Sequence, residues 1–487
     1  MSWDQLSPLS LDLLLAGGIL LLLAVDMILP RLGRANADLS AGILAIVLAA
    51  SFVVDTGGSA IGGAYVGGVW PLLFKRVFLS AGIIATLGSS AHVNRCYPRR
   101  QGEYYLLLLF SLLGMTLLAG AQDLILLLVC FELMSLPLAI LAAFDKNDIE
   151  RGQQRTPEGA LKFYLVGVTS TALTLFGISL LFGMAHTTNI AELGAADPTP
   201  LSTLGMMLVL SGLGFKIGAV PFHMWVPDTY QGSGTPFVSL LSVAPKLAGF
   251  AVLSLLFLQG LGGWRADWVP VVAALSLVTI LVGNLLALPQ RNVKRLLACS
   301  GVAQIGYMLM AFASASAEGL GVLLFYAAGY TATNMGAFLI VQSLAADGGD
   351  DSLDSFDGLA QRSPGLALSM LLFLLSLAGI PFVVGFWSKL YVFIAAWHAG
   401  LGWLVVVGAV LAVVALFYYL QIARAMYIHP AREGRPVAVS RRLKLAIAIC
   451  TAVVVGMGAW PNPFLEATRE ASRHFFAILH ASSISIN

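Results

Sequence analysis

The chain has 487 residues and a formal net charge of +2; hydrophobic residues make up 58% of it and charged residues only 11%. Soluble domains carry about 25% charged residues, so this composition, with a mean hydropathy of +0.87, excludes an ordinary water-soluble fold. The apolar runs are long rather than short and alternating, which excludes an outer-membrane barrel.

Fourteen apolar stretches have about the length that a membrane-spanning helix needs. We expect spans near 8–29, 39–56, 72–93, 103–120, 122–144, 159–182, 200–220, 235–258, 268–289, 293–314, 319–344, 366–397, 401–428 and 441–460. The predicted fold class is therefore an all-α polytopic membrane protein with about 14 transmembrane helices, forming a single membrane domain over 1–487. The first span has no basic segment before it, which favours a retained helix over a signal peptide. The tail 461–487 mixes apolar and charged residues, which is typical of an amphipathic helix at a membrane surface.

The cysteine pattern and the loops indicate that this chain carries no cofactor and no metal. The four cysteines are scattered without a CxxC spacing, so zinc, iron–sulfur and disulfide frameworks are not expected. No stretch is long enough for a soluble nucleotide- or flavin-binding domain, and the small net charge gives no indication of nucleic-acid binding. The glycine-rich segment Gly57–Gly68 lacks the context of a phosphate-binding loop, and we expect a flexible loop there.

Basic residues predict the orientation, because they accumulate on the cytoplasmic side of membrane proteins. If the N-terminus is outside and the spans alternate, the inside segments hold 18 Lys and Arg and the outside segments hold 5. This asymmetry predicts that both termini lie outside, in the periplasm of a bacterial inner membrane. It also assigns 23 of the 27 basic residues to the two surfaces.

The four remaining basic residues lie within predicted spans, and all four are lysines: Lys162, Lys216, Lys246 and Lys389. Among the acidic residues only Glu132 lies near the centre of a span. An ionisable group at the membrane centre costs about 2.5–3.5 kcal/mol on insertion scales, which favours a functional role for the five.

The choice of lysine narrows that role, since arginine stays protonated whereas a buried lysine releases its proton readily. Lysines and a carboxylate are therefore typical of a proton path, whereas an anion site would favour arginine. Two plainer interpretations remain open: Lys162, about a turn from its span start, would snorkel to the interface, and Glu132 would be a structural partner of a lysine.

Two predicted spans combine Pro and Gly with a lysine. Residues 218–222 and 378–382 share a small-small-apolar-Pro-Phe pattern, near Lys216 and Lys389. Proline breaks the helical ladder, and broken helices at membrane depth expose backbone groups that hold water or ions. The two spans are an odd number of spans apart and run in opposite directions. This pattern favours inverted five-helix repeats, 103–258 (helices 4–8) and 268–428 (helices 9–13), although ordinary proline kinks are the alternative.

Three further polar residues are auxiliary candidates. His223 follows the first Pro-Phe pair and would either relay protons or donate a structural hydrogen bond. Gln304 and Tyr307 lie in the tenth predicted span. Their side chains order water but carry no charge near neutral pH.

These motifs resemble subunit N of the antiporter-like subunit family in proton-pumping NADH–quinone oxidoreductase, respiratory complex I. The matching stretches are Gly102–Tyr105, Phe131–Pro137, Phe215–Tyr230, Thr235–Pro236, Pro245–Lys246, Asn292–Ala298, Asp357–Ala360 and Gly379–Lys389. The resemblance implies fourteen helices, inverted five-helix repeats and broken helices 7 and 12.

The resemblance also implies roles for individual residues. Glu132 is the fifth-helix carboxylate with Lys216 as its seventh-helix partner, Lys246 is the central lysine, Lys389 is the exit-side lysine, and Lys162 matches a sixth-helix lysine. Gln304 departs from the family, where we expect histidine; because glutamine does not titrate, water held by Gln304 would substitute.

The leading hypothesis is thus a proton-translocating subunit without a redox centre. FMN, iron–sulfur clusters and quinone are expected on partner subunits, and the partners are other complex I membrane subunits, including neighbouring antiporter-like ones, and the lipid bilayer. Two alternatives are a subunit of a multisubunit cation/proton antiporter and a solute permease.

Overall fold

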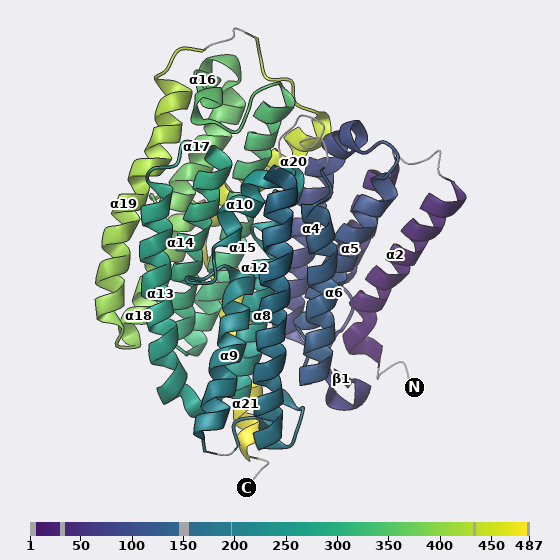
Figure 1. Cartoon of the computed structure of the whole chain (residues 1–487), viewed down its shortest axis with the longest axis vertical. Coiled ribbons are helices and arrows are strands. Elements are labelled where there is room, and N and C mark those ends of the chain that lie inside the picture. Colours follow the sequence, from purple (N-terminus) through teal and green to yellow (C-terminus); the bar gives the residue numbers. More distant parts are fainter. Residues whose placement is uncertain (1–5, 30–34, 146–154, 196, 432–434, 485–487) are drawn as a thin grey trace.

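The computed structural model describes residues 6–29, 35–145, 155–195, 197–431 and 435–484, which form one helical bundle (Figure 1). The N-terminal part contains the short helix η1 Ser7–Leu9, α2 Ser10–Ile28, α3 Asn36–Ala50, the strands β1 Ser59–Ala60 and β2 Tyr65–Val66 around η3 Ile61–Gly63, and α4 Val69–Cys96. Long apolar runs form helices here because a helix satisfies its own backbone groups where water is absent.

The middle of the chain contains the elements that hold four of the predicted site residues. They are α5 Gln101–Leu118, α6 Leu124–Ala142, α8 Arg155–Ala185, η4 Ile190–Glu192, α9 Pro200–Ile217, α10 Trp225–Gly232, α11 Thr235–Leu241, α12 Ala244–Leu253 and the π-helical η5 Ser254–Gly260. Side-chain caps begin several of them: Asp123 accepts hydrogen bonds from two amides of α6, and Thr199 and Ser202 form a capping box at α9.

The C-terminal half of the chain also consists of helices joined by short segments. It contains η6 Gly262–Trp264, α13 Arg265–Ala287, α14 Val293–Ala313, α15 Ala317–Ala346, η7 Leu353–Phe356, α16 Leu359–Arg362, α17 Pro364–Ala378, α18 Val384–His398, α19 Gly402–Tyr427, α20 Arg441–Ala459 and α21 Asn462–Ile484. In Figure 1, the start of α2 and the helix α21 lie at the lower end of the bundle, and α16 lies at the upper end.

Twelve helices in the described part of the chain are long and apolar enough to cross a membrane. The two predicted spans outside these twelve are the second, where α3 has 15 residues, and the twelfth, which is divided into α17 and α18. The count of fourteen spans and the inverted-repeat arrangement stay predictions.

The core of the bundle is formed by the stretch Thr235–Gly260 together with α14 and α15, which are buried along nearly their whole apolar length. Figure 1 shows these helices between α13 and α19 on one side and α4 to α6 on the other. Lys246 and Gln304 lie on these central helices, so their side chains are enclosed by protein rather than by lipid.

Two segments that we expected to be loop or tail pack against the bundle. The segment Gly57–Gly68 is not a simple flexible loop, because it contains the β1–β2 hairpin, and Tyr65 of the hairpin is fully buried. The tail forms α21, where Ser472 donates to the Ala317 carbonyl at 2.6 Å and the Phe475 ring lies 4.7 Å from that of Trp70. Whether α21 touches a membrane surface stays a prediction.

Candidate functional site

The first interruption separates α9 from α10, between Lys216 and His223. Gly218 ends α9 in the left-handed conformation, at φ 77°, which glycine adopts without strain. The freed backbone groups find new partners: Val220 N donates to Thr279 Oγ1 at 3.1 Å, and Trp225 Nε1 donates to the Phe215 carbonyl at 3.1 Å. These two bonds fix the interruption, which holds Lys216 at the end of a helix.

Lys216 is 8% exposed and donates from Nζ to Ser135 Oγ at 2.7 Å. Ser135 in turn donates to the Phe131 carbonyl at 2.7 Å, and the ammonium lies 4.8 Å from the centre of the Phe131 ring. A hydroxyl and an aromatic face thus stabilise the cation without a direct counter-ion.

Glu132 lies on α6 one turn from Ser135 and accepts a hydrogen bond from Thr171 Oγ1 of α8 at 2.8 Å. Within the described ranges Glu132 and Lys216 make no ion pair with each other, although the resemblance implied a partnership. Both line one cavity of about 250 Å3 between α6, α8 and α9. The two side chains therefore border one cavity.

Lys246 lies on α12, just past a second interruption that was not expected from the sequence. Helix α11 ends at Leu241 and α12 begins at Ala244, with Pro245 in its first turn. Lys246 is 1% exposed, and no protein group in the described part of the chain lies within hydrogen-bond distance of its Nζ. Its Nζ lies over the Tyr230 ring, 5.5 Å from the ring centre.

Glycine at position 301 makes room beside Lys246. A β-carbon on Gly301 would lie 2.9 Å from the Tyr330 hydroxyl and 3.5 Å from Lys246 Nζ. The hydroxyls of Tyr230 and Tyr330 and the amide oxygen of Asn334 are, like Lys246 Nζ, buried without a protein partner in the described part of the chain. Of these groups, the Tyr230 ring and the Tyr330 hydroxyl lie near the central lysine, and Asn334 lies beside Ser242.

A row of buried hydroxyls leads along α11 to Lys246. Thr235, Ser239 and Ser242 precede it at intervals of four, three and four residues. Ser242 donates to the Ser239 carbonyl at 2.9 Å and accepts from Asn334 Nδ2 at 2.8 Å. The helical spacing of these hydroxyls is visible in the sequence and would have been enough to indicate the row, although we did not predict it.

Lys389 lies on α18, beyond the interruption that follows α17. Its Nζ donates to the Leu377 carbonyl at 2.8 Å and to the Ala378 carbonyl at 3.0 Å. Leu377 would normally bond to the amide four residues later, but that residue is Pro381, which has no N–H. Lys389 therefore binds carbonyls that the helix end leaves open, where a cation is favoured by the helix dipole.

Gln304 and Tyr307 lie on α14, and their side chains are close to Lys389. Gln304 Nε2 donates to the same Leu377 carbonyl at 2.9 Å and to the Tyr419 hydroxyl at 3.2 Å, and its Oε1 accepts from the Tyr326 hydroxyl. Tyr307 donates to the Gly408 carbonyl at 2.9 Å, and its ring lies 5.0 Å from Lys389 Nζ.

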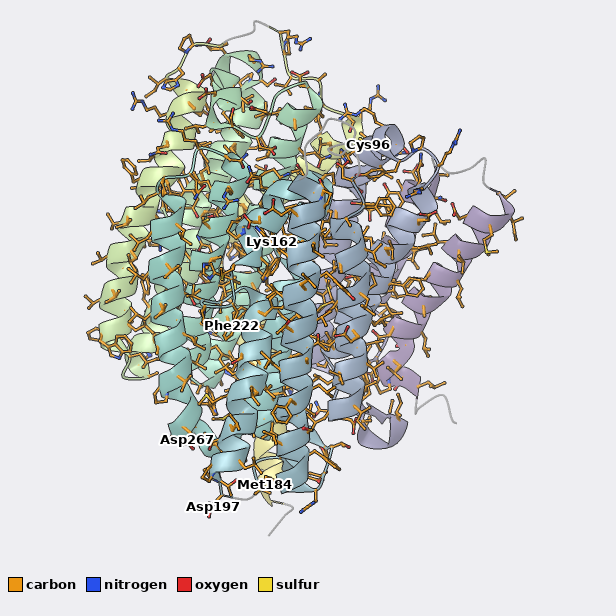
Figure 2. The ribbon with its side chains drawn as sticks, viewed as in Figure 1. Cys96, Lys162, Met184, Asp197, Phe222 and Asp267 are labelled. Atoms are coloured by element: carbon orange, nitrogen blue, oxygen red, sulfur yellow. The ribbon has the colours of Figure 1, made fainter. Side chains whose placement is uncertain are left out.

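Lys162 is not brought together with the three buried lysines. Its side chain is 43% exposed and forms ion pairs with Asp228 at 2.7 Å and Glu158 at 2.6 Å, and Asp228 also binds Arg295 at 2.7 Å. In Figure 2, Lys162 lies above Phe222 of the first interruption, towards the end that carries Cys96. This geometry favours the snorkelling interpretation.

His223 is partly buried in the first interruption, and its Nδ1 has no protein partner in the described part of the chain. The relay role of His223 stays a prediction.

Two lysines that we had assigned to the membrane surfaces are buried within the protein, although their assignment to the two sides of the membrane stays a prediction. Lys75 is 2% exposed and forms an ion pair with Asp12, which also accepts from Tyr65. Lys294 is 4% exposed and donates to the Ser233 carbonyl at 2.9 Å. Their positions near span ends hid this, because burial there depends on loops that pack over them.

The described residues contain no group of three or more His, Cys, Asp or Glu side chains arranged to hold a metal ion. The side chains at the helix interruptions offer amines, one carboxylate, hydroxyls and amides.

Comparison with known proteins gives consistent matches. The family described as NADH:quinone oxidoreductase/Mrp antiporter, TM matches residues 121–415. NADH-quinone oxidoreductase subunit N of Moorella thermoacetica is 38% identical over 97% of this chain and 99% of its own length. The subunit N of Heliobacterium modesticaldum is 41% identical over 84% of this chain and 85% of its own length.

Solved structures show the same fold. A chain of respiratory complex I from Thermus thermophilus with bound aureothin is 30% identical and has a TM-score of 0.79, with 94% of this chain and 99% of that chain covered. A chain of the Mrp complex from Dietzia sp. has a TM-score of 0.87 over 98% of both chains, at 21% identity, which shows likeness of fold alone.

Proposed function

This chain belongs to the membrane-subunit family that NADH:quinone oxidoreductases and Mrp antiporters share, and we propose that it carries protons through a buried Glu/Lys relay as subunit N of a proton-pumping NADH–quinone oxidoreductase. It is a multi-pass membrane protein. In this proposal FMN, the iron–sulfur clusters and quinone belong to partner subunits, and this chain translocates protons.

The observation that carries the proposal is the position of three buried lysines at helix interruptions. Lys216 precedes the glycine that ends α9, Lys246 follows the start of α12, and Lys389 binds the end of α17. Buried charges are expensive in a membrane and mark ion paths by default. Lysine in all three places fits groups that bind and release protons.

Electrostatics supplies a way to drive the relay. Moving one charge through 100 mV costs about 2.3 kcal/mol, and two unit charges 4 Å apart interact by about 4 kcal/mol at an effective dielectric constant of 20. Approach of the Glu132 carboxylate to Lys216 within their common cavity would stabilise the protonated lysine, and separation would favour release. In the structure Glu132 is hydrogen-bonded to Thr171 and Lys216 to Ser135. This arrangement corresponds to the state in which the two charges are separated.

The hydroxyl row on α11 supports a route to the central lysine. Thr235 begins this helix beside the buried Lys294, and Ser242 ends the row next to the interruption that precedes Lys246. Hydroxyls donate and accept at once, so they suit the transfer of protons between ordered waters. In the proposed orientation Thr235 lies towards the cytoplasm.

The proposed partners and location follow from the family. We place the chain in a bacterial inner membrane with both termini in the periplasm, beside other complex I membrane subunits, including neighbouring antiporter-like ones. The basic asymmetry of the loops supports this orientation.

Mass spectrometry of the solubilised native assembly tests the proposal. Flavin- and iron–sulfur-containing partners support the complex I subunit; partners without redox centres indicate a cation/proton antiporter; and a chain that purifies alone indicates a permease.

Proton uptake by proteoliposomes containing the assembled complex then tests the relay. Lys246→Ala is expected to abolish pumping, and Lys444→Ala, at an exposed lysine of α20, is the matched control. Normal pumping by Lys246→Ala would refute the relay.

A further inference from the structure

Gln304 is a buried amide whose hydrogen bonds reach three other helices. It is 2% exposed on α14. Its Nε2 donates to Leu377 of α17 and to Tyr419 of α19, and its Oε1 accepts from Tyr326 of α15. Every polar atom of this amide is therefore engaged by protein. Both amide hydrogens are used in this way, whereas the oxygen keeps a second lone pair, so the water-ordering role that we expected from the sequence stays a prediction.

The Leu377 carbonyl is shared by Gln304 and Lys389. The distances are 2.9 Å from Gln304 Nε2 and 2.8 Å from Lys389 Nζ. A carbonyl oxygen has two lone pairs and accepts two donors. The Leu377 carbonyl has no helical donor, since the residue four positions later is Pro381, which has no N–H. The two side chains thus satisfy a single backbone group at the helix end.

We propose that Gln304 is a positioning residue that keeps the Leu377 carbonyl satisfied when Lys389 gives up its proton. An amide does not titrate at accessible pH, so its donor is present throughout the cycle. Without it, the protonated Lys389 is the only side-chain donor to this buried carbonyl among the residues that the structure describes, and release of the proton leaves the carbonyl with the weaker donor of a neutral amine. This inference rests on the proposed proton-carrying role of Lys389.

The other titratable groups that face this site are tyrosine hydroxyls. They are Tyr307 on α14, Tyr326 and Tyr330 on α15, and Tyr418 and Tyr419 on α19. Tyrosine ordinarily titrates near pH 10 and is neutral near pH 7, and the proposed relay assigns the change of protonation at this site to Lys389. A plain structural role for Gln304, as a link between four helices, is the competing explanation.

The test is Gln304→Met in the full complex, with proton pumping per turnover measured in proteoliposomes as a function of pH. Methionine keeps the length of the side chain and removes the donor. Proton release becomes harder, so the pumping profile is expected to move to higher pH by about one unit, the effect of roughly one hydrogen bond. Gln304→His, which restores a ring N–H donor, is expected to move the profile back towards that of the wild type.

Gln342→Met is the matched control. Gln342 is also a buried glutamine on a central helix, and its Nε2 donates to the Gly88 carbonyl at 2.8 Å, away from the lysines. This variant is expected to leave the pumping profile in place, even if it lowers the yield of assembled complex.

Four outcomes separate the explanations. An unshifted profile for Gln304→Met, with or without a lower yield, overturns the positioning role. An equal shift in both methionine variants also overturns it, because the effect is then not specific to Lys389. Normal pumping by Lys389→Ala refutes the proposed function itself, whereas loss of pumping by Lys389→Ala with no shift in Gln304→Met refutes only the role of Gln304.

Discussion

Lys246 and Lys389 are both buried lysines, but within the described part of the chain only Lys389 has hydrogen-bond partners in the protein. Lys246 is 1% exposed with no protein group bonded to its Nζ, and Lys389 is 5% exposed with two carbonyl acceptors. Replacing each by methionine removes a similar burial penalty, which in proteins amounts to several kcal/mol per ion. The two variants should therefore differ in stability by the hydrogen bonds that Lys389 alone makes.

The size of this difference follows from those two bonds. A hydrogen bond to a charged group contributes about 1.5–3 kcal/mol, so Lys246→Met should be more stable than Lys389→Met by about 3–6 kcal/mol. An unfolding entropy of about 2.1 cal/mol/K per residue gives about 1 kcal/mol/K for a chain of 487 residues. The Tm values should then differ by about 3–6 °C, with Lys246→Met above the wild type.

The assay is thermal unfolding of the purified complex in detergent, followed through this subunit, together with pumping in proteoliposomes. Both variants are expected to lose pumping, so stability and function separate at Lys246. A Tm for Lys246→Met at or below that of Lys389→Met would refute the reasoning, since it would mean that Lys246 is bonded as well as Lys389 is.

Three further changes test other parts of the site. Lys216→Arg keeps the charge but does not release a proton, so pumping should fall nearly to the level of an alanine variant. Lys216→His should pump at a rate between those of the wild type and the arginine variant. Near-normal proton uptake by the arginine variant would exclude a relay role for Lys216. Ser242→Ala should slow pumping several-fold, whereas Ser254→Ala, at a buried serine beyond the central lysine, should not; equal rates in a stopped-flow pH assay would exclude the hydroxyl row. Lys162→Ala breaks an exposed ion pair with Asp228 worth about 0–1 kcal/mol, so pumping should fall less than twofold, and complete loss would show that Lys162 belongs to the relay.

Local chemistry explains why much of this site was predictable from the sequence. A lysine within an apolar run is conspicuous whatever surrounds it, so Lys216, Lys246 and Lys389 could be singled out and are all buried. Glycine and proline act on their own backbone, so the helix ends at Ile217 and Ala378 fall where Gly218 and Gly379 predict them. The membrane class follows from composition in the same way.

Contacts between residues far apart in the chain could not be predicted from the sequence, because no local pattern specifies which side chains meet. The separation of Glu132 from Lys216, each with its own hydroxyl partner, depends on how α6, α8 and α9 pack. Burial of Lys75 depends equally on its meeting with Asp12, 63 residues away.

The Leu377 carbonyl shows what neighbouring residues determine and what the packing of helices determines. Gly379 ends the helix just after Leu377, and the residue four positions later is Pro381, which has no N–H, so this oxygen has no helical donor. Only the tertiary structure decides that Gln304, 73 residues away, and Lys389 fill the position together. Sequence determines which backbone groups are left open because that is a matter of neighbouring residues, and packing decides what satisfies them because that depends on which helices lie side by side.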